Sequence, residues 1–299
     1  MTTQKITKGS GQGEFSKKYS RNEFQTIINY TDQDPEHKKK LNKLDDNLCR
    51  YKDIYPYLNN SIHLSQSSHQ YINASWMHIF TEKDFIASQG PNDNTVDDFL
   101  DMCFENNICG ILMLCNEFED NKKKCSTYWD QNMISSKYQF TGGQVKHQNE
   151  VIVEKIIQIQ NKSTGVQMLF PHLNFKKWPD HKTPDIENYV KLFEILFNFV
   201  DTCRTNNKNQ PFLVHCSAGI GRTGVFLTLY GICNEIIRQI NYDDGDDVLI
   251  FNVFNFVRKL KEMRMFSVEN INQYNFIYKF LEEYLREKNV YSQINGRIN

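Results

Sequence analysis

The chain has 299 residues, of which 39% are hydrophobic, so it can bury a sizeable core, and this argues against wholesale disorder. Lysine and arginine (35) nearly cancel aspartate and glutamate (36), and a net charge of −1 gives no general case for nucleic acid as a partner. No apolar run approaches the roughly 20 residues that cross a bilayer, so we expect no membrane segment.

Cysteine usage predicts a reducing compartment. The eight cysteines include no Cys-x-x-Cys pair and no Cys/His cluster at zinc spacing, so no metal site is expected. Several lie inside apolar runs, as Cys115 does, where cysteine behaves as a small buried hydrophobe. Because the polar N-terminus also lacks a secretory signal, we expect the cytoplasm. Cys216 is the exception among the eight because of its neighbours.

The way in which composition changes along the chain indicates one domain. Residues 1–20 are polar and rich in Gly, Ser and Lys, and we interpret them as a flexible arm. Apolar residues then recur without a long gap, and no linker or internal repeat divides them. We therefore predict one domain over residues 21–288 and a short tail over residues 289–299.

Hydrophobic periodicity predicts helices mixed with strands. In chain order we expect a helix over 96–104, a buried strand over 110–114, a helix over 186–200, a buried strand over 212–214, and helices over 223–237, 248–263 and 271–285. An acidic turn over 243–247 separates two of the helices. Helices and strands mixed in this way indicate an α/β fold.

The segment from Leu213 to Gly224 predicts a strand, a tight loop and a helix. Glycines inside the loop let the backbone curl so that successive N–H groups point inward. Such an array binds an anion, and the positive end of the following helix adds to it. Arg222 closes the ring with a planar fork that can bind two phosphate oxygens. The field that binds phosphate also stabilises the Cys216 thiolate, which would face the phosphorus.

Two residues beside this loop are expected to assist it. His215 would orient the loop by hydrogen bonding, and the Thr223 hydroxyl would donate to the sulfur and help it leave. The spacing Cys-x5-Arg is weak by itself. Flanked by His and Thr-Gly, with glycines inside and a strand and helix outside, it is a specific signal for phosphate chemistry.

The run from His215 to Gly224 resembles the signature of the tyrosine-specific, cysteine-based protein tyrosine phosphatases, and the resemblance extends from about Asn22 to Leu285. It implies a highly twisted mixed β-sheet flanked by α-helices, no metal or organic cofactor, and phosphotyrosine-containing proteins or peptides as substrates. A monomer is expected. The loop residues that would bind the phosphate are Ser217, Ala218, Gly219, Ile220 and Gly221.

Trp178-Pro-Asp180 is similar to the acid loop of this family. Expulsion of a phenolate needs a proton donor, so Asp180 would be the general acid and then the base that activates water. Trp178 would anchor the hinge of the loop. Lys182 stands where the family commonly has glycine, which affects the closure of the loop and not the acid itself.

Asn47 to Asp53 resembles the phosphotyrosine-recognition loop of the family, except that Leu48-Cys49 replaces the usual Lys-Asn. The resemblance implies that Tyr51 stacks on the substrate ring and makes the pocket deep. Phosphoserine would then be too short to reach the nucleophile. Asp53 would accept hydrogen bonds from the substrate backbone.

Glu119 to Trp129 is similar to the neighbouring loop that supports the site. By this resemblance Glu119 would pair with Arg222, and Lys124 would approach Asp180.

The segment from Val268 to Tyr274 departs most from the family. The family has two glutamines four residues apart, and the first positions the hydrolytic water. Here the first is Glu269 and only Gln273 is kept. An ionised carboxylate cannot donate to a phosphate oxygen and repels the dianion. We therefore expect slow hydrolysis of the phosphocysteine.

Three functions fit these residues. An active phosphotyrosine phosphatase is favoured because Cys216, Arg222 and Asp180 are all present. A phosphotyrosine-binding pseudophosphatase with weak or no turnover is the alternative that Glu269 and Lys182 motivate. A dual-specificity or phosphoinositide phosphatase fits less well, since the loop interior has no lysine for additional phosphates.

Overall fold

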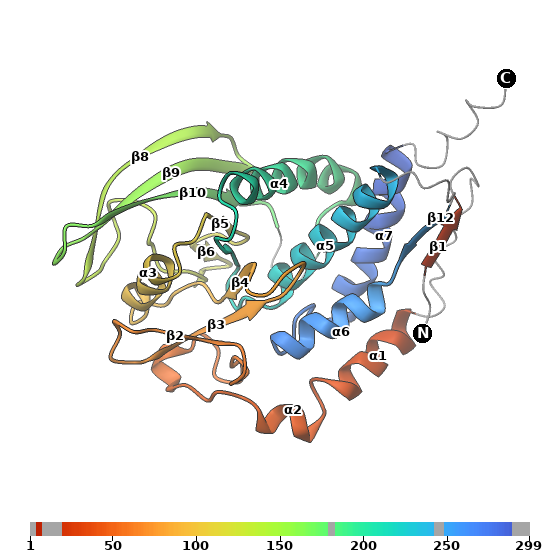
Figure 1. The fold of residues 1–299 in the computed structure, drawn as a ribbon, viewed down its shortest axis with the longest axis horizontal. Helices are drawn as coiled ribbons and strands as arrows, with labels where there is room; N and C mark the ends of the chain where they lie inside the picture. Colours follow the sequence, from red (N-terminus) through yellow and green to blue (C-terminus); the bar gives the residue numbers. More distant parts are fainter. Residues whose placement is uncertain (1–3, 8–19, 179–182, 242–247, 289–299) are drawn as a thin grey trace.

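An eight-stranded mixed sheet forms the centre of the molecule (Figure 1). The computed structural model describes residues 4–7, 20–178, 183–241 and 248–288. The strands lie in the order β2, β3, β4, β11, β5, β10, β9, β8. Their bounds are β2 Ser61–His63, β3 Tyr71–Met77, β4 Phe85–Ser88, β5 Gly110–Met113, β8 Tyr138–Gln148, β9 Ile152–Asn161, β10 Gln167–Phe175 and β11 Phe212–His215.

The middle of the sheet is parallel and both flanks are antiparallel. β11 pairs in parallel with β4 and β5, and β5 pairs in parallel with β10. All residues of β4, β5 and β11 are buried, which explains why they form short continuous apolar runs with no polar alternation. The predicted strands over 110–114 and 212–214 are confirmed with ends shifted by one residue.

Seven α-helices are described. They are α1 Ser20–Tyr30, α2 Pro35–Lys39, α3 Val96–Glu105, α4 Ile186–Asn206, α5 Gly221–Asn241, α6 Val253–Met263 and α7 Ile271–Glu287. α4 and α5 pack on β11, α7 packs on both of these helices, and α3 lies on the other side of the sheet (Figure 1). The expected twisted sheet flanked by helices is therefore confirmed. A 3-10 turn, Asp46–Leu48, and a small hairpin, β6 Phe118–Glu119 with β7 Lys122–Lys123, lie beside the sheet.

The predicted helix over 248–263 is wrong in its first part. Val248–Phe251 is strand β12, and helix α6 starts after Asn252, whose side chain accepts a hydrogen bond from the Asn255 N–H. Leu249 and Phe251 are buried while Ile250 is 44% exposed, so the side chains alternate as in a strand. The predicted turn over 243–247 lies outside the described residues.

β12 pairs antiparallel with β1, Gln4–Thr7, in a separate two-stranded sheet. Residues 4–7 fall within the segment that we interpreted as a flexible arm, and the sequence did not indicate this pairing. The partners are more than 240 residues apart, so local composition could not reveal it.

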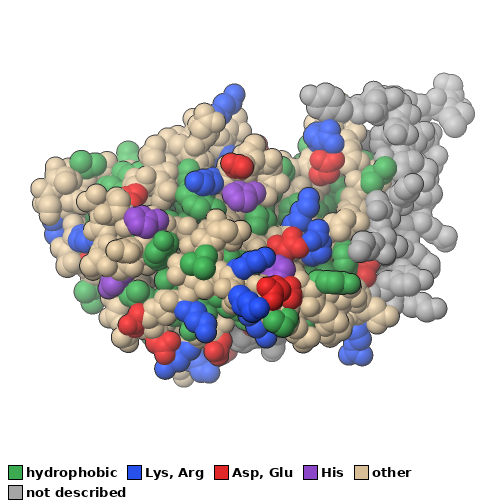
Figure 2. All heavy atoms as spheres, turned by 60° about the horizontal axis from the view of Figure 1, so that its bottom comes forward, with side chains coloured by type: hydrophobic (Ala, Val, Ile, Leu, Met, Phe, Trp, Pro, Cys, Tyr) green, Lys and Arg blue, Asp and Glu red, His purple; other side chains and the backbone are tan. Residues whose placement is uncertain are grey.

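Figure 2 shows basic and acidic side chains interspersed on the face that it presents, with hydrophobic side chains scattered between them. This distribution agrees with the net charge of −1. Among the described helices, none is both long and apolar enough to cross a membrane.

Candidate active site

The loop between β11 and α5 forms the floor of a small pocket of about 70 Å³. Its lining comes from three separate parts of the chain: the loop itself, the segment after the 3-10 turn, and the start of α7. The lining residues are Tyr51, Ile54, Cys216, Ser217, Ala218, Ile220, Gly221, Arg222, Glu269 and Gln273. The fold therefore brings together most of the residues that the sequence singled out.

Gly219 sets the curvature of the loop. Its φ is +69°, and a Cβ there would lie 2.1 Å from the carbonyl oxygen of Ser88, so no other residue fits without displacing β4. In this conformation the Gly219 N–H donates to the Sγ of Cys216 at 3.3 Å. Cys216 itself is only 4% exposed. The sulfur is therefore held inside the loop, next to the N–H of Gly219.

Arg264 holds the loop from behind, and it was not among the residues that the sequence motifs singled out. Its guanidinium donates to the carbonyl oxygens of Gly219 at 2.7 Å and Ala218 at 3.0 Å, and to the side chains of Ser75 and Asn73. Burial lowers the pKa of Arg264 to about 10. With these carbonyls turned toward Arg264, their peptide N–H groups point into the pocket.

A second buried network reaches the loop through His215. Its Nδ1 donates to the Cys216 carbonyl oxygen at 3.0 Å, and its Nε2 lies 2.6 Å from the Tyr128 hydroxyl. The same hydroxyl lies 3.0 Å from Nε2 of His172. Burial lowers the pKa of His172 well below its usual value. The expected orienting role of His215 thus has a structural basis, and Tyr128 and His172 extend it.

Arg222 is fixed by Glu119, as the resemblance implied. Its two terminal nitrogens donate to the two carboxylate oxygens at 2.6 and 2.5 Å, and Nη1 also donates to the Leu114 carbonyl oxygen at 3.0 Å. Burial opposes the charge on Arg222, but the hydrogen bonds to Glu119 outweigh it and raise the pKa above its usual value. Arg222 is therefore a permanent cation at the pocket wall.

The expected hydrogen bond from Thr223 to Cys216 is absent. The Thr223 hydroxyl is buried in the first turn of α5 and makes no hydrogen bond to any part of the chain that the structure describes. The sulfur instead accepts a hydrogen bond from the Gly219 N–H. A role for Thr223 in releasing the sulfur remains a prediction.

The segment from Tyr51 to Asp53, which we call the recognition segment, lies at the mouth of the pocket. The Tyr51 hydroxyl lies 2.9 Å from the Ser217 hydroxyl, which in turn donates to the Lys124 carbonyl oxygen at 3.0 Å. The Tyr51 ring is 37% exposed and lines the pocket. Asp53 is exposed and does not line it.

Arg50 attaches this segment to the rest of the site, and the sequence analysis missed it. Its side chain donates to the carbonyl oxygens of Gly90 and Lys123, each at 2.9 Å, and to that of Pro91. Its backbone N–H donates to the Gln89 side chain at 2.9 Å. Tyr51 follows Arg50 directly, so these hydrogen bonds hold the backbone from which the Tyr51 side chain extends.

Glu269, just before the cap of α7, and Gln273, in its first turn, lie together in the wall of the pocket. The Glu269 N–H donates to the Gln273 side-chain oxygen at 2.9 Å. A Cβ on Gly221 would lie 2.8 Å from the Gln273 nitrogen and 3.0 Å from a Glu269 carboxylate oxygen. The carboxylate of Glu269 therefore faces the phosphate loop, where the family has an amide.

The predicted acid segment is described only at its start. Trp178 is 2% exposed, and its ring packs against Tyr189 with centroids 5.1 Å apart and near-perpendicular planes. Asp180 and Lys182 lie outside the described residues, so the predicted approach of Lys124 to Asp180 does too. Lys124 itself is buried. In the described part of the chain, no group of His, Cys, Asp or Glu side chains is arranged to hold a metal ion.

Comparisons with known proteins agree with this geometry. The protein-tyrosine phosphatase family model matches residues 45–283. Tyrosine-protein phosphatase non-receptor type 20 from Rattus norvegicus is 34% identical over 247 residues, which are 79% of this chain and 54% of that protein. The human type 20 protein is 34% identical over 246 residues, with 80% and 54% covered. The chain thus spans about half the length of these relatives.

A solved structure shares the fold as well. The crystal structure of the catalytic domain of human protein tyrosine phosphatase non-receptor type 18 superimposes with a TM-score of 0.71 at 26% identity. The match covers 88% of this chain and 95% of that one. Because the family model matches most of the chain, the chain belongs to the protein-tyrosine phosphatase family.

Proposed function

We propose that this chain hydrolyses phosphotyrosine in proteins through a phosphocysteine intermediate on Cys216. The observation that carries the proposal is the surroundings of the Cys216 sulfur. It lies on the floor of a pocket, with the Gly219 N–H directed at it and the Arg222 cation in the wall. A phosphate dianion held there would meet a nucleophile, inward N–H groups and a fixed positive charge.

In the first step the thiolate attacks phosphorus, and the bond from phosphorus to the tyrosine oxygen breaks. Asp180 gives its proton to the leaving oxygen, because tyrosine is a far better leaving group than tyrosinate. In the second step Asp180 takes a proton from water, which attacks phosphorus and releases the Cys216 thiolate. Arg222 stabilises the equatorial oxygens in both steps.

Tyr51 supports phosphotyrosine as the substrate. Its ring rises from the mouth of the pocket and its hydroxyl is fixed to Ser217, so a substrate ring would stack on it while the phosphate reaches Cys216. Solved structures titled as the type 18 phosphatase in complex with phosphopeptides show that a protein of this fold takes such ligands. We propose phosphotyrosine proteins of the cytoplasm as substrates, and a monomer formed by one catalytic domain over residues 21–288.

Turnover of an aryl phosphate tests the proposal. We expect that the chain hydrolyses an aryl phosphate and that Cys216→Ser abolishes this activity. The Asp180→Ala variant should lose turnover but still bind and capture phosphotyrosine peptides from a lysate. Phosphoserine peptides should be hydrolysed far more slowly, and equal rates on both would favour a dual-specificity enzyme.

A pseudophosphatase is the second candidate, and the Glu269 carboxylate beside Gly221 is the observation that favours it. A carboxylate there repels the phosphate and cannot donate to it, so the phosphocysteine would be hydrolysed slowly. Rapid-quench kinetics should then show a burst of phenol release, and Glu269→Gln should accelerate the steady state. Phosphopeptide binding without any turnover would establish the pseudophosphatase, whereas no burst and no gain from Glu269→Gln would contradict the slow second step.

A further inference from the structure

The loop between α6 and α7 holds three consecutive carbonyl groups of the phosphate loop. The Arg264 side chain donates to the carbonyl oxygens of Ala218 and Gly219, and the Val268 N–H donates to that of Ile220 at 3.2 Å. In a trans peptide the C=O and the N–H point in opposite directions. With these three carbonyls turned toward the α6–α7 loop, the N–H groups of the same peptides point into the pocket.

The α6–α7 loop has an unusual backbone conformation. The φ angle is +59° at Phe266 and +57° at Val268, in the left-handed region that a β-branched residue rarely adopts. Val268 is fully buried, and a Cβ on Gly224 would lie 2.5 Å from its nitrogen, so the loop packs tightly against the first turn of α5. A strained backbone of this kind persists only where its surroundings hold it. Contacts from outside the loop are therefore needed.

Asp32, in the turn between α1 and α2, makes such contacts. One of its carboxylate oxygens accepts a hydrogen bond from the Phe266 N–H at 3.0 Å, and the other accepts one from the Lys261 ammonium at 2.7 Å. The side chains of Asp32 and Lys261 are 7% and 0% exposed. Because hydrogen bonds to a buried charge are among the strongest in proteins, these two can offset the strain in the α6–α7 loop.

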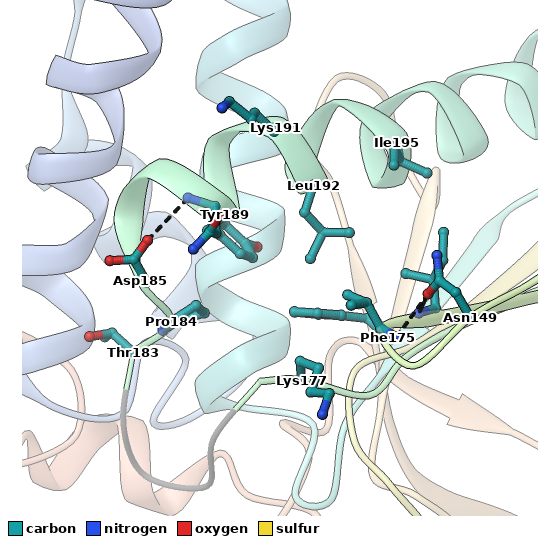
Figure 3. A pocket seen from close by; sticks show the side chains of 13 residues that line it. Asn149, Phe175, Lys177, Thr183, Pro184, Asp185, Tyr189, Lys191, Leu192 and Ile195 are labelled. Atoms are coloured by element: carbon teal, nitrogen blue, oxygen red, sulfur yellow. Dashed lines mark hydrogen bonds between the residues drawn. The ribbon is translucent and has the colours of Figure 1, made fainter.

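Asp185 shows how a carboxylate is more commonly used (Figure 3). It is exposed and accepts the N–H of Asn188, three residues away, as the cap of α4. Asp32 differs, because its two hydrogen bonds within the described chain reach residues 229 and 234 positions further on. It therefore stabilises no helix of its own, and its effect falls on the loop that carries Phe266.

We propose that Asp32 is a positioning residue for the reaction: by accepting the Phe266 N–H, it keeps the α6–α7 loop against the phosphate loop, whose N–H groups then face the phosphate. Asp32 does not line the pocket, so it acts through the loop and not on the substrate. Val268 directly precedes Glu269, so the same contact also sets where the Glu269 carboxylate lies. The proposal rests on the proposed function, since it requires that the phosphate loop binds a phosphoryl group.

Two double variants separate the hydrogen bond from the ion pair. Asp32→Leu/Lys261→Met and Asp32→Asn/Lys261→Met both remove the two buried charges together, but only asparagine keeps an oxygen for the Phe266 N–H. We expect the leucine variant to bind tungstate, a tetrahedral dianion like phosphate, about tenfold more weakly in calorimetry, and its kcat on an aryl phosphate to fall about tenfold. The asparagine variant should keep both within about threefold of the wild-type values.

Asp101→Leu/Lys137→Met is the matched control. These two side chains also form a carboxylate–lysine pair, at 2.6 Å with Asp101 2% exposed, and neither lines the pocket. The control should lower the free energy of unfolding but leave tungstate binding unchanged, at a temperature where every variant is folded. An equal loss of binding in this control or in the asparagine variant would overturn the proposal. Wild-type binding by the leucine variant would overturn it as well.

Circular dichroism checks that each variant folds, and Asp32→Ala/Lys261→Met replaces the leucine variant if that one does not. Calorimetry needs no turnover, so it tests Asp32 separately from the proposed activity. If the wild-type chain binds tungstate but hydrolyses no aryl phosphate, the proposed activity fails, and the order of the tungstate affinities still decides on Asp32. If the wild-type chain does not bind tungstate, the phosphate loop is not an anion site and the proposal fails with it.

Discussion

The phosphate loop and the recognition segment face the same pocket but are held in opposite ways. The loop is buried, and its carbonyls and side chains are tied by Arg264, His215 and Glu119. The segment from Tyr51 to Asp53 is exposed, and the hydroxyl of Tyr51 is its contact with the loop. The proposed nucleophile and cation are thus held by the core, whereas the residues proposed to select the substrate have exposed side chains that can change without disturbing the fold.

Arg222→Lys tests the loop side of this comparison and should have the largest effect. An ammonium group cannot reproduce the planar fork that Glu119 orients, so kcat on an aryl phosphate should fall about a thousandfold. The measurement is steady-state kinetics at saturating substrate. Because lysine keeps the positive charge, a loss of less than tenfold would mean that charge alone suffices and that the bidentate geometry is unimportant.

Arg264→Met asks whether the network behind the loop matters as much as the pocket itself. Loss of the guanidinium leaves the buried carbonyls of Ala218 and Gly219 unpaired, so the free energy of unfolding should fall by about 3 kcal/mol. Loop misplacement should lower kcat about a hundredfold. Urea denaturation and turnover measure the two effects. Arg258→Met is the control, since Arg258 is partly exposed and pairs with Glu262 on the surface of α6.

Tyr128→Phe removes one hydroxyl from the network of His172 and His215. The His215 ring then loses the partner of its Nε2, and kcat should fall about tenfold as the Cys216 carbonyl becomes less well oriented. Tyr138→Phe is a matched control, because its hydroxyl is also buried and hydrogen-bonded, to Asp101 at 2.7 Å, but lies away from the loop. If both variants lower kcat equally, the effect is general destabilisation and not loop orientation.

Asp53→Ala tests the exposed segment and should have the smallest effect. We expect KM for a phosphotyrosine peptide to rise about threefold, as is usual for an exposed polar contact, with kcat and the thermal midpoint unchanged. The same variant should not affect a small aryl phosphate that has no peptide backbone. A loss of stability would show that the segment supports the fold and would weaken the contrast between the two regions.

The parts of the site that the sequence predicted are those whose residues follow one another. The loop from His215 to Arg222 carries its own glycines, cation and nucleophile between a strand and a helix, and these features taken together reveal it. Arg264 and Arg50 act through backbone carbonyls of remote loops. Every residue has a backbone carbonyl, so the sequence does not indicate which ones accept a hydrogen bond. A signal for Arg264 existed, since it follows the apolar face of α6, where an arginine is unexpected.

The same reasoning explains the fold. Buried strands β5 and β11 were predicted because each is a short continuous apolar run, and the helices α3, α4 and α7 because their periodicity is strong. β12 was assigned to a helix because its four residues are as apolar as the helix that follows, and its partner β1 lies near the other end of the chain. Short strands that depend on distant partners carry too little local pattern to be recognised.

The position of β11 between β4 and β5 has a consequence for synthesis of the protein. β5 ends at Met113 and β11 starts at Phe212, so the slot for the central strand stays open while the intervening chain is made. At 5–20 residues per second this takes roughly 5 to 20 s, during which two strand edges are unpaired. Two edges that the folded protein pairs are thus open to aggregation in this interval, and the phosphate loop cannot take its place before β11, which Cys216 follows directly, closes the gap in the sheet.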